Sequence, residues 1–301
     1  MKTPSYIMPL LLLLALFGAI NPVYLAGQQA NFNHAFGTSF DNVFTKVVPS
    51  GTNYYVLGRD EPADGAVTRA TVSRLNDQGQ HQWTLSLNTG SQWNDAVLTP
   101  SGNLLLVGNS LPFDANTQGL MGLVTPSGAF SWLRSYSTTG RDWFNRVVLN
   151  PAPESANFPY YVLGGQWDPG GNTTWDDILL LTMSESGALG WKKIYTGPFN
   201  STDDEFGRDL EALPNGDLLL AGNLGTTGVL FRAKNTGELY NGAGPEGLPF
   251  SFADVTQTGS GFYAVGNALS GFLAYLFKFD NDLLPVWQIA IPTLSAVSQV
   301  W

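Results

Sequence analysis

The sequence predicts an all-β fold built from repeated four-stranded antiparallel sheets. The stretch WNDAVLTPSGNLLLVGN, residues 93–109, recurs in altered form along the chain. Related stretches begin at Phe40, Trp143, Phe206 and Phe252, and each contains a hydrophobic strand, a turn with glycine and a second strand that ends in glycine. A chain that repeats one such unit is an array of equivalent sheets.

The spacing of the glycines that close each second strand indicates the kind of array. These glycines are Gly58, Gly108, Gly164, Gly222 and Gly266, so the repeat lengths are 108−58=50, 164−108=56, 222−164=58 and 266−222=44 residues. Such lengths, with four strands in each unit, are typical of the blades of a β-propeller. The five full blades that we predict span about residues 40–87, 93–136, 143–195, 206–240 and 252–291.

The second unit shows the strand order that we expect in every blade. Residues 93–98 form the innermost strand and residues 104–107 form the second strand. The run of three leucines and a valine in this second strand has no polar alternation, which is typical of a strand buried on both faces. Residues 120–124 and 130–136 then form the third and outermost strands. We expect the closing glycine to permit a bulge or a close approach between blades.

An aromatic residue lies near the start of each predicted outermost strand. In chain order these residues are Trp83, Trp132, Trp191, Tyr240 and Trp287. Because a blade widens toward its rim, a large ring at this position can fill the space against the adjacent blade. We therefore interpret the five aromatic residues as packing residues.

The two ends of the sequence resemble parts of a sixth unit. Residues 31–36 have the position of an outermost strand, with Phe32 or Phe36 in place of the tryptophan. Residues 295–301 have the position of an innermost strand and form a partial blade. The second and third strands of this unit are missing. We therefore predict that the ring is incomplete in this chain and that downstream domains belong to the whole protein.

Three tryptophans lie four residues after a turn glycine, as 83−79=4, 132−128=4 and 191−187=4. This motif resembles the outer-strand motif of quinoprotein-like propeller repeats. It is also similar to the repeats at the front of large secreted bacterial surface proteins with C-terminal sorting domains. The resemblance covers about residues 32–301 and implies a propeller, secretion and surface display, without a particular substrate. Catalytic quinoproteins have vicinal cysteines, whereas this chain has none, so no quinone or other cofactor is predicted.

The N-terminus has the layout of a secretory signal peptide. Lys2 precedes a nearly all-apolar run over residues 7–20, and the helix-breaking Pro22 follows directly. This run is shorter than the roughly 20 apolar residues that a membrane-spanning helix needs. We therefore predict a signal peptide at residues 1–27, a propeller domain at residues 28–301, no later membrane span, and a location outside the cell or on its surface.

Composition excludes some partners and restricts how the fold is stabilised. With 14 basic and 24 acidic residues the formal charge is −10, which disfavours binding to nucleic acid and anionic lipid. Because the chain has no cysteine, its stability has to come from the burial of apolar surface rather than from disulfides.

The longer connections of the predicted blades lie on one face of the disc and carry tryptophans beside carboxylates. Loops on a rigid scaffold often bind ligands, and exposed tryptophans suit sugar rings or extended peptides. We predict a binding face for a glycan or protein ligand at Trp93, Asp142, Trp143, Trp167, Asp168, Trp175, Asp176 and Asp177. Burial in the core remains open for Trp93 and Trp143, because both begin innermost strands.

The function predicted from these features is a noncatalytic scaffold or binding module. The alternative is a carbohydrate-active enzyme, a glycosidase or lyase, that uses loop carboxylates such as Asp142 and Asp177. His34 and His81 are the only histidines, and neither has a serine in a nucleophile-elbow context, so no catalytic triad is predicted. No metal site is predicted either, because the acidic clusters lack the alternating pattern of a calcium loop.

Overall fold

The computed structural model describes residues 41–61, 67–138, 140–167, 176–195, 204–244, 249–268 and 273–292. Every regular element within these ranges is a β-strand, which confirms the prediction of an all-β fold. These ranges contain no helix with the length and apolar character needed to cross a membrane. The predicted signal peptide at residues 1–27 and the partial blade at residues 295–301 lie outside the described residues.

The described strands form five antiparallel units of four strands, numbered here as the first to fifth sheets. The first sheet contains β1 (Asp41–Ser50), β2 (Asn53–Glu61), β3 (Arg69–Leu75) and the first half of β4 (His81–Leu98). The second sheet contains the second half of β4, β5 (Leu104–Ser110), β6 (Gly119–Val124) and β7 (Phe130–Tyr136).

The remaining sheets have the same order from the innermost to the outermost strand. The third sheet contains β8 (Arg141–Leu149), β9 (Tyr160–Trp167), β10 (Asp177–Met183) and β11 (Leu189–Tyr195). The fourth contains β12 (Glu205–Ala212), β13 (Leu218–Leu224), β14 (Thr227–Ala233) and β15 (Leu239–Ala243). The fifth contains β16 (Phe250–Thr258), β17 (Gly261–Ala268), β18 (Leu273–Phe279) and β19 (Pro285–Pro292).

One strand is shared by two sheets. The part of β4 that pairs with β3 is the outermost strand of the first sheet, and the part from Ser91 onward pairs with β5 as the innermost strand of the second. The predicted first blade ends at residue 87 and the second begins at residue 93, whereas the strand runs through both. Because the connection between them is short, the chain passes from the rim to the centre without leaving the extended conformation.

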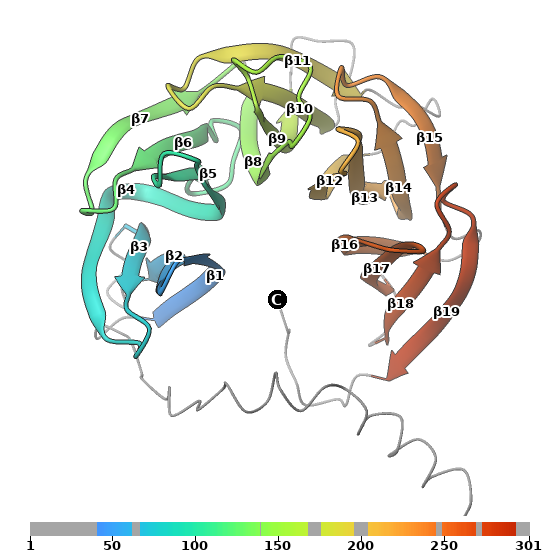
Figure 1. Cartoon of the computed structure of the whole chain (residues 1–301), viewed down its shortest axis with the longest axis horizontal. Helices are drawn as coiled ribbons and strands as arrows, with labels where there is room; N and C mark the ends of the chain where they lie inside the picture. Colours follow the sequence, from blue (N-terminus) through green and yellow to red (C-terminus); the bar gives the residue numbers. More distant parts are fainter. Residues whose placement is uncertain are drawn as a thin grey trace, which may run out of the picture.

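The sheets are arranged radially around a central axis (Figure 1). Figure 1 shows β1, β8, β12 and β16 nearest to the axis and β7, β11, β15 and β19 at the perimeter. The described residues do not close the ring, since an open sector separates β1–β3 from β16–β19.

The apolar core consists of four clusters, each between two adjacent sheets. Strand β5 contributes to two of them: Leu104 and Leu106 face the first sheet, whereas Leu105 and Val107 face the third. All four side chains are fully buried. The prediction that this second strand is buried on both faces is therefore confirmed.

The closing glycines lie opposite a β-bulge in each innermost strand. In the third sheet the register shifts between Phe144 and Arg146, directly beside the pair formed by Phe144 and Gly164. A Cβ atom on Gly164 would lie 1.9 Å from the carbonyl oxygen of Trp143, and one on Gly108 would lie 2.0 Å from that of Gln92. Glycine recurs here because the backbone of the bulge occupies the place of a side chain.

The rim tryptophans pack onto the next sheet. The indole nitrogen of Trp132 donates a hydrogen bond to the carbonyl oxygen of Glu185 at 2.9 Å, and that of Trp83 donates to Pro126 at 3.2 Å. A Cβ atom on Gly187, which has a φ of 78°, would lie 3.1 Å from the Trp132 ring. The ring of one sheet thus covers the turn between the third and fourth strands of the next sheet.

Two of the five rim aromatics differ from this pattern. Tyr240 is 46% exposed, and its hydroxyl donates a hydrogen bond to Asp217 of its own sheet at 2.7 Å. Trp287 in the fifth sheet is 37% exposed. Both rings do contact side chains of their own sheet, Trp287 with Tyr263 and Tyr240 with Arg232, but they are more exposed than a ring that fills the space between two sheets. For Trp287 the reason is that β19 borders the open sector rather than another described sheet.

Candidate functional site

Arg141, the first residue of β8, connects several of the predicted face residues. Its guanidinium forms a bidentate ion pair with Asp176, with Nε–Oδ1 at 2.9 Å and Nη2–Oδ2 at 2.5 Å. Asp176 directly precedes β10, so the pair joins two strands of the third sheet at the edge where the longer connections lie. A bidentate pair fixes the plane of the guanidinium as well as its position.

Three aromatic rings surround this guanidinium. The Arg141 Cζ atom lies 5.4 Å from the ring centroid of Phe113, 5.9 Å from that of Trp143 and 5.5 Å from that of Trp167. Phe113 meets Trp143 edge to face, with the centroids 5.2 Å apart. These distances are in the range of cation–π contacts. We call Phe113, Arg141, Trp143, Trp167 and Asp176 the Arg141 cluster.

The Arg141 cluster has an accessible layer and a buried layer. Phe113 is 47% exposed, while Arg141 and Trp167 are partly buried. Trp143 and Asp176 are buried beneath them. Desolvation raises the pKa of Asp176, and the hydrogen bonds and charge of Arg141 oppose this rise. A ligand would therefore meet two aromatic rings and a guanidinium that a buried carboxylate holds in place.

The other two described carboxylates of the predicted face are also buried. Asp142 accepts hydrogen bonds from the backbone nitrogen of Thr138 at 2.6 Å and from its hydroxyl at 2.9 Å. Asp177 is 8% exposed. Asp142 on β8 and Asp177 on β10 both lie opposite Gln166 of β9, so they flank the strand between them. Asp142 thus holds the segment that leads into β8, and neither carboxylate is presented at the surface.

The remaining predicted residues do not join the Arg141 cluster. Trp93 is fully buried between the first and second sheets, and its ring centroid lies 6.4 Å from that of Phe130. It therefore has the core position that the sequence left open. Asp168 and Trp175 lie outside the described residues.

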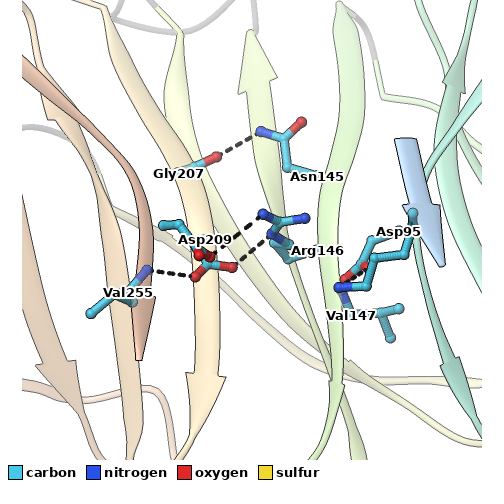
Figure 2. Close-up of polar contacts among 9 residues, drawn as sticks. Asp95, Asn145, Arg146, Val147, Gly207, Asp209 and Val255 are labelled. Atoms are coloured by element: carbon cyan, nitrogen blue, oxygen red, sulfur yellow. Dashed lines mark hydrogen bonds and ion pairs between the residues drawn. The ribbon is translucent and has the colours of Figure 1, made fainter. Parts of the chain in front are cut away.

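A second polar arrangement, which was not predicted from the sequence, joins the innermost strands around the axis (Figure 2). The residue that directly follows the bulge is charged in every sheet. In order from the first sheet these residues are Lys46, Asp95, Arg146, Asp209 and Asp254. We call these five residues the inner-strand network.

One bridging pattern occurs two times in the inner-strand network. Asp95 lies 3.0 Å from Lys46 of the sheet before it and accepts a hydrogen bond from the backbone nitrogen of Val147 in the sheet after it, also at 3.0 Å. Asp209 accepts in the same way from Arg146 Nε at 2.6 Å and from the backbone nitrogen of Val255 at 2.9 Å (Figure 2). Each carboxylate therefore ties together three consecutive sheets.

The bulge residues add a parallel set of contacts. Asn145 donates from Nδ2 to the carbonyl oxygen of Gly207 at 2.6 Å (Figure 2), and Asn94 donates to that of Phe144 at 2.7 Å. The hydroxyl of Thr45 donates to the carbonyl oxygen of Trp93 at 2.8 Å. In each case the first residue of the bulge has a backbone carbonyl group that accepts a hydrogen bond from a side chain of the preceding sheet.

A repeated signal in the sequence could have revealed the inner-strand network. Where an aromatic residue opens the bulge, the charged residue follows two positions later. The four such pairs are Phe44 and Lys46, Trp93 and Asp95, Phe144 and Arg146, and Phe252 and Asp254. A charge that recurs at one fixed position of the repeated innermost strands indicates a buried pairing between repeats.

Asp254 is expected to make stability depend on pH. Desolvation and the adjacent carboxylate of Asp209 raise the pKa of Asp254 to about 6, although Arg146 and Lys46 oppose the rise. An unfolded carboxyl group has a pKa near 3.9, so between about pH 4 and 6 the folded state binds more protons and stability falls as pH rises. Solvent reduces the effect, because the side chain is 61% exposed.

Replacement of the carboxyl group tests this expectation. Urea unfolding between pH 4 and 7 should show that Asp254→Asn loses this decline and gains stability relative to the parent as pH rises. Asp282→Asn, at an exposed turn of the same sheet, is the control and should follow the parent. Parallel curves for the parent and Asp254→Asn would contradict the assignment.

No protein-family model matches the sequence, and no curated protein matches it. Solved structures do resemble the fold. A protein of unknown function from Bacteroides caccae has a TM-score of 0.54 and 14% identity, with 87% of this chain and 85% of that chain covered. A protein from Lactobacillus plantarum has a TM-score of 0.51 and 13% identity, with 83% of this chain and 82% of that chain covered.

The periplasmic gluconolactonase of Pseudomonas aeruginosa is similar over 86% of this chain and 87% of that chain, with 13% identity and a TM-score of 0.46. At such low identities, similarity supports the fold alone. Together with the radial four-stranded antiparallel sheets, the first two structures support the conclusion that this chain has a β-propeller fold.

Proposed function

We propose that this protein is a noncatalytic binding module, secreted or displayed at the cell surface, that binds glycans through the Arg141 cluster. The observation that carries the proposal is the accessible layer of that cluster, in which Phe113 and Trp167 both lie next to the Arg141 guanidinium. Aromatic faces stack on the apolar faces of sugar rings, and guanidinium groups donate hydrogen bonds to sugar hydroxyls.

The contacts of Arg141 favour binding over a purely structural role. A guanidinium has five N–H donors, and the pair with Asp176 uses two of them. The same pair fixes its orientation before a ligand arrives, which lowers the entropic cost of binding. The surrounding strands β8, β9 and β10 supply a rigid base for the site.

The buried state of the loop carboxylates favours binding without hydrolysis. Glycosidases need two carboxyl groups on either side of the scissile bond. Asp142 and Asp177, the pair considered for such a mechanism, are 0% and 8% exposed. A substrate would reach them only after the edge of the third sheet rearranged.

Secretion and a ring that extends beyond the five described sheets belong to the same proposal. Secretion is supported by the pattern of residues 1–27 and by the resemblance to repeats of bacterial surface proteins. The larger ring is supported by the open sector between the first and fifth sheets (Figure 1) and by the sequence of residues 295–301, which matches the start of another repeat.

A glycan array with the purified chain tests the binding proposal. Phe113→Ala and Trp167→Ala should each weaken binding about fivefold, because an aromatic stacking contact is worth about 1 kcal/mol. Leu284→Ala removes an exposed apolar side chain from the fifth sheet and should leave binding unchanged.

Other outcomes would replace the proposal in defined ways. Glycan binding that survives both aromatic substitutions would move the site away from the Arg141 cluster. Binding to a peptide library, but to no glycan, would replace glycans with protein ligands. Release of sugar fragments that Asp142→Asn or Asp177→Asn abolishes would support the enzymatic alternative.

A further inference from the structure

The first sheet exposes apolar side chains at positions that are buried in every other sheet. Val47, which follows the charged residue of β1, is 55% exposed. The residues at the same position in the other four sheets are Ala96, Val147, Leu210 and Val255, with exposures of 5%, 3%, 3% and 4%. Each of these four belongs to a cluster shared with the preceding sheet. Val47 is therefore an apolar residue of the kind that packs between two sheets, but no described sheet precedes the first sheet to cover it.

Phe44, which opens the bulge of β1, shows the same difference. It is 52% exposed, whereas the equivalent aromatic residues Trp93, Phe144 and Phe252 are fully buried. Phe144 is covered by the outermost strand of the preceding sheet, where the ring centroid of Tyr136 lies 5.5 Å away. The exposed face of the first sheet is therefore an inter-sheet interface with one side missing.

The residues just before β1 repeat the spacing of that covering strand. Tyr136 precedes Phe144 by 144−136=8 residues, and Phe36 precedes Phe44 by 44−36=8. The rim position behaves in the same way, since 144−132=12 for Trp132 and 44−32=12 for Phe32.

Intervals at the other junctions depend on the length of the connection. The interval from rim aromatic to bulge is 252−240=12 between the fourth and fifth sheets, 93−83=10 where β4 is continuous, and 207−191=16 before the fourth sheet. Phe32 therefore has the 12-residue interval found between the second and third sheets and between the fourth and fifth sheets. Phe36 has the 8-residue interval found between the second and third sheets.

We propose that residues 31–40 dock on the exposed face of the first sheet as a covering outermost strand, with Phe36 over Phe44. In this arrangement Phe32 lies over the turn at Gly79, as Trp83 lies over Gly128 and Trp132 over Gly187 in the next sheets. Gly79 has a φ of 73°, like the other turn glycines. In this arrangement the series of aromatic rings that cover successive turns begins with Phe32, before the first described strand.

Chemistry and tethering both favour this segment over a second copy of the chain. Residues 31–40, NFNHAFGTSF, include three phenylalanines and no lysine, arginine, aspartate or glutamate, which suits an apolar face. The segment also enters β1 directly, as the first half of β4 enters its second half. Such a short tether gives a high effective concentration.

Cross-linking tests the proposal without background, because the natural chain has no cysteine. The variant with both Phe36→Cys and Phe44→Cys should form an intrachain disulfide, or an intrachain link with a short bis-maleimide. Phe36→Cys combined with Ile194→Cys, a partly exposed position on the third sheet, is the control and should form neither. No intrachain product from the first pair would overturn the proposal.

A mixture of the two single variants, Phe36→Cys and Phe44→Cys, separates the two occupants. A covalent dimer in that mixture would show that the segment of a second copy covers the face, which also overturns the proposal. Hydrogen exchange gives a readout that does not depend on thiols. Amides of residues 31–40 should exchange at least tenfold more slowly than an unstructured peptide in the parent, and lose most of that protection in Phe44→Ala.

Failure of this proposal and failure of the proposed function are distinguishable. The cross-linking and exchange experiments concern the first sheet and need no ligand. The glycan experiment concerns the third sheet and is read in variants with an intact N-terminal segment.

Discussion

Gly164→Ala is expected to lower the free energy of unfolding by about 3 kcal/mol or more, at the upper end of the cost of overpacking. The added methyl group would lie 1.9 Å from the carbonyl oxygen of Trp143, 2.9 Å from its carbonyl carbon and 3.0 Å from the Cα of Phe144. All three are backbone atoms of the bulge in β8, so no side chain can rotate away to make room. Relief would require the bulge to shift, and with it the contacts of Asn145 and Arg146.

Gly259→Ala is the matched control for this prediction. A Cβ atom on Gly259 would meet no atom within 4 Å, and its φ is outside the left-handed region. Alanine there should be neutral or stabilise by about 0.5 kcal/mol, because it restricts the unfolded chain. Urea unfolding followed by circular dichroism measures both variants. A loss below 1 kcal/mol for Gly164→Ala would mean that the bulge is not locked against its glycine.

Asp209→Ala is expected to cost about 3 to 5 kcal/mol, the range for removing one partner of a buried ion pair. The side chain of Asp209 is 9% exposed and that of Arg146 is 23% exposed. Without the carboxylate, the Arg146 guanidinium and the backbone nitrogen of Val255 both lose an acceptor inside the protein. The third, fourth and fifth sheets would then lose their shared contact near the axis.

A double-mutant cycle separates the interaction energy of Arg146 with Asp209 from the cost of leaving one charge buried without its partner. Arg146→Met together with Asp209→Leu should cost less than the sum of the single changes, because no uncompensated charge remains. Glu238→Gln, which breaks the exposed pair with Lys234, should leave stability unchanged. The pKa of Asp254 should also fall toward its ordinary value in Asp209→Ala, since the neighbouring carboxylate is gone. Additive single effects would mean that Asp209 and Arg146 act independently.

The repeat made much of the fold predictable. Strand order, the double burial of Leu104–Val107 and the need for glycine at positions such as Gly164 depend on residues close together in the sequence and recur in each unit. The rim position was predictable for Trp83 and Trp132, whose next sheet is present. The exposure of Trp287 was not predictable, because the cover of a rim residue depends on a neighbouring sheet that the local pattern does not include.

The candidate site was predictable only in part. Trp143, Trp167 and Asp176 were expected on one face, and they do lie around Arg141. The role of Arg141 was not anticipated, because its partner lies 176−141=35 residues away, directly before a strand that is not the immediate neighbour of β8. Asp142 was expected at the surface, but Thr138 covers it.

The repeated pattern of residues was enough to show that this protein is a series of equivalent antiparallel sheets, because periodic burial and turn residues act within each unit. Which polar groups meet depends on how the sheets are arranged in space. Contacts such as Lys46 with Asp95, or Arg146 with Asp209, depend on the register between neighbouring sheets. That register is set by how whole apolar faces interlock, which no single repeat encodes.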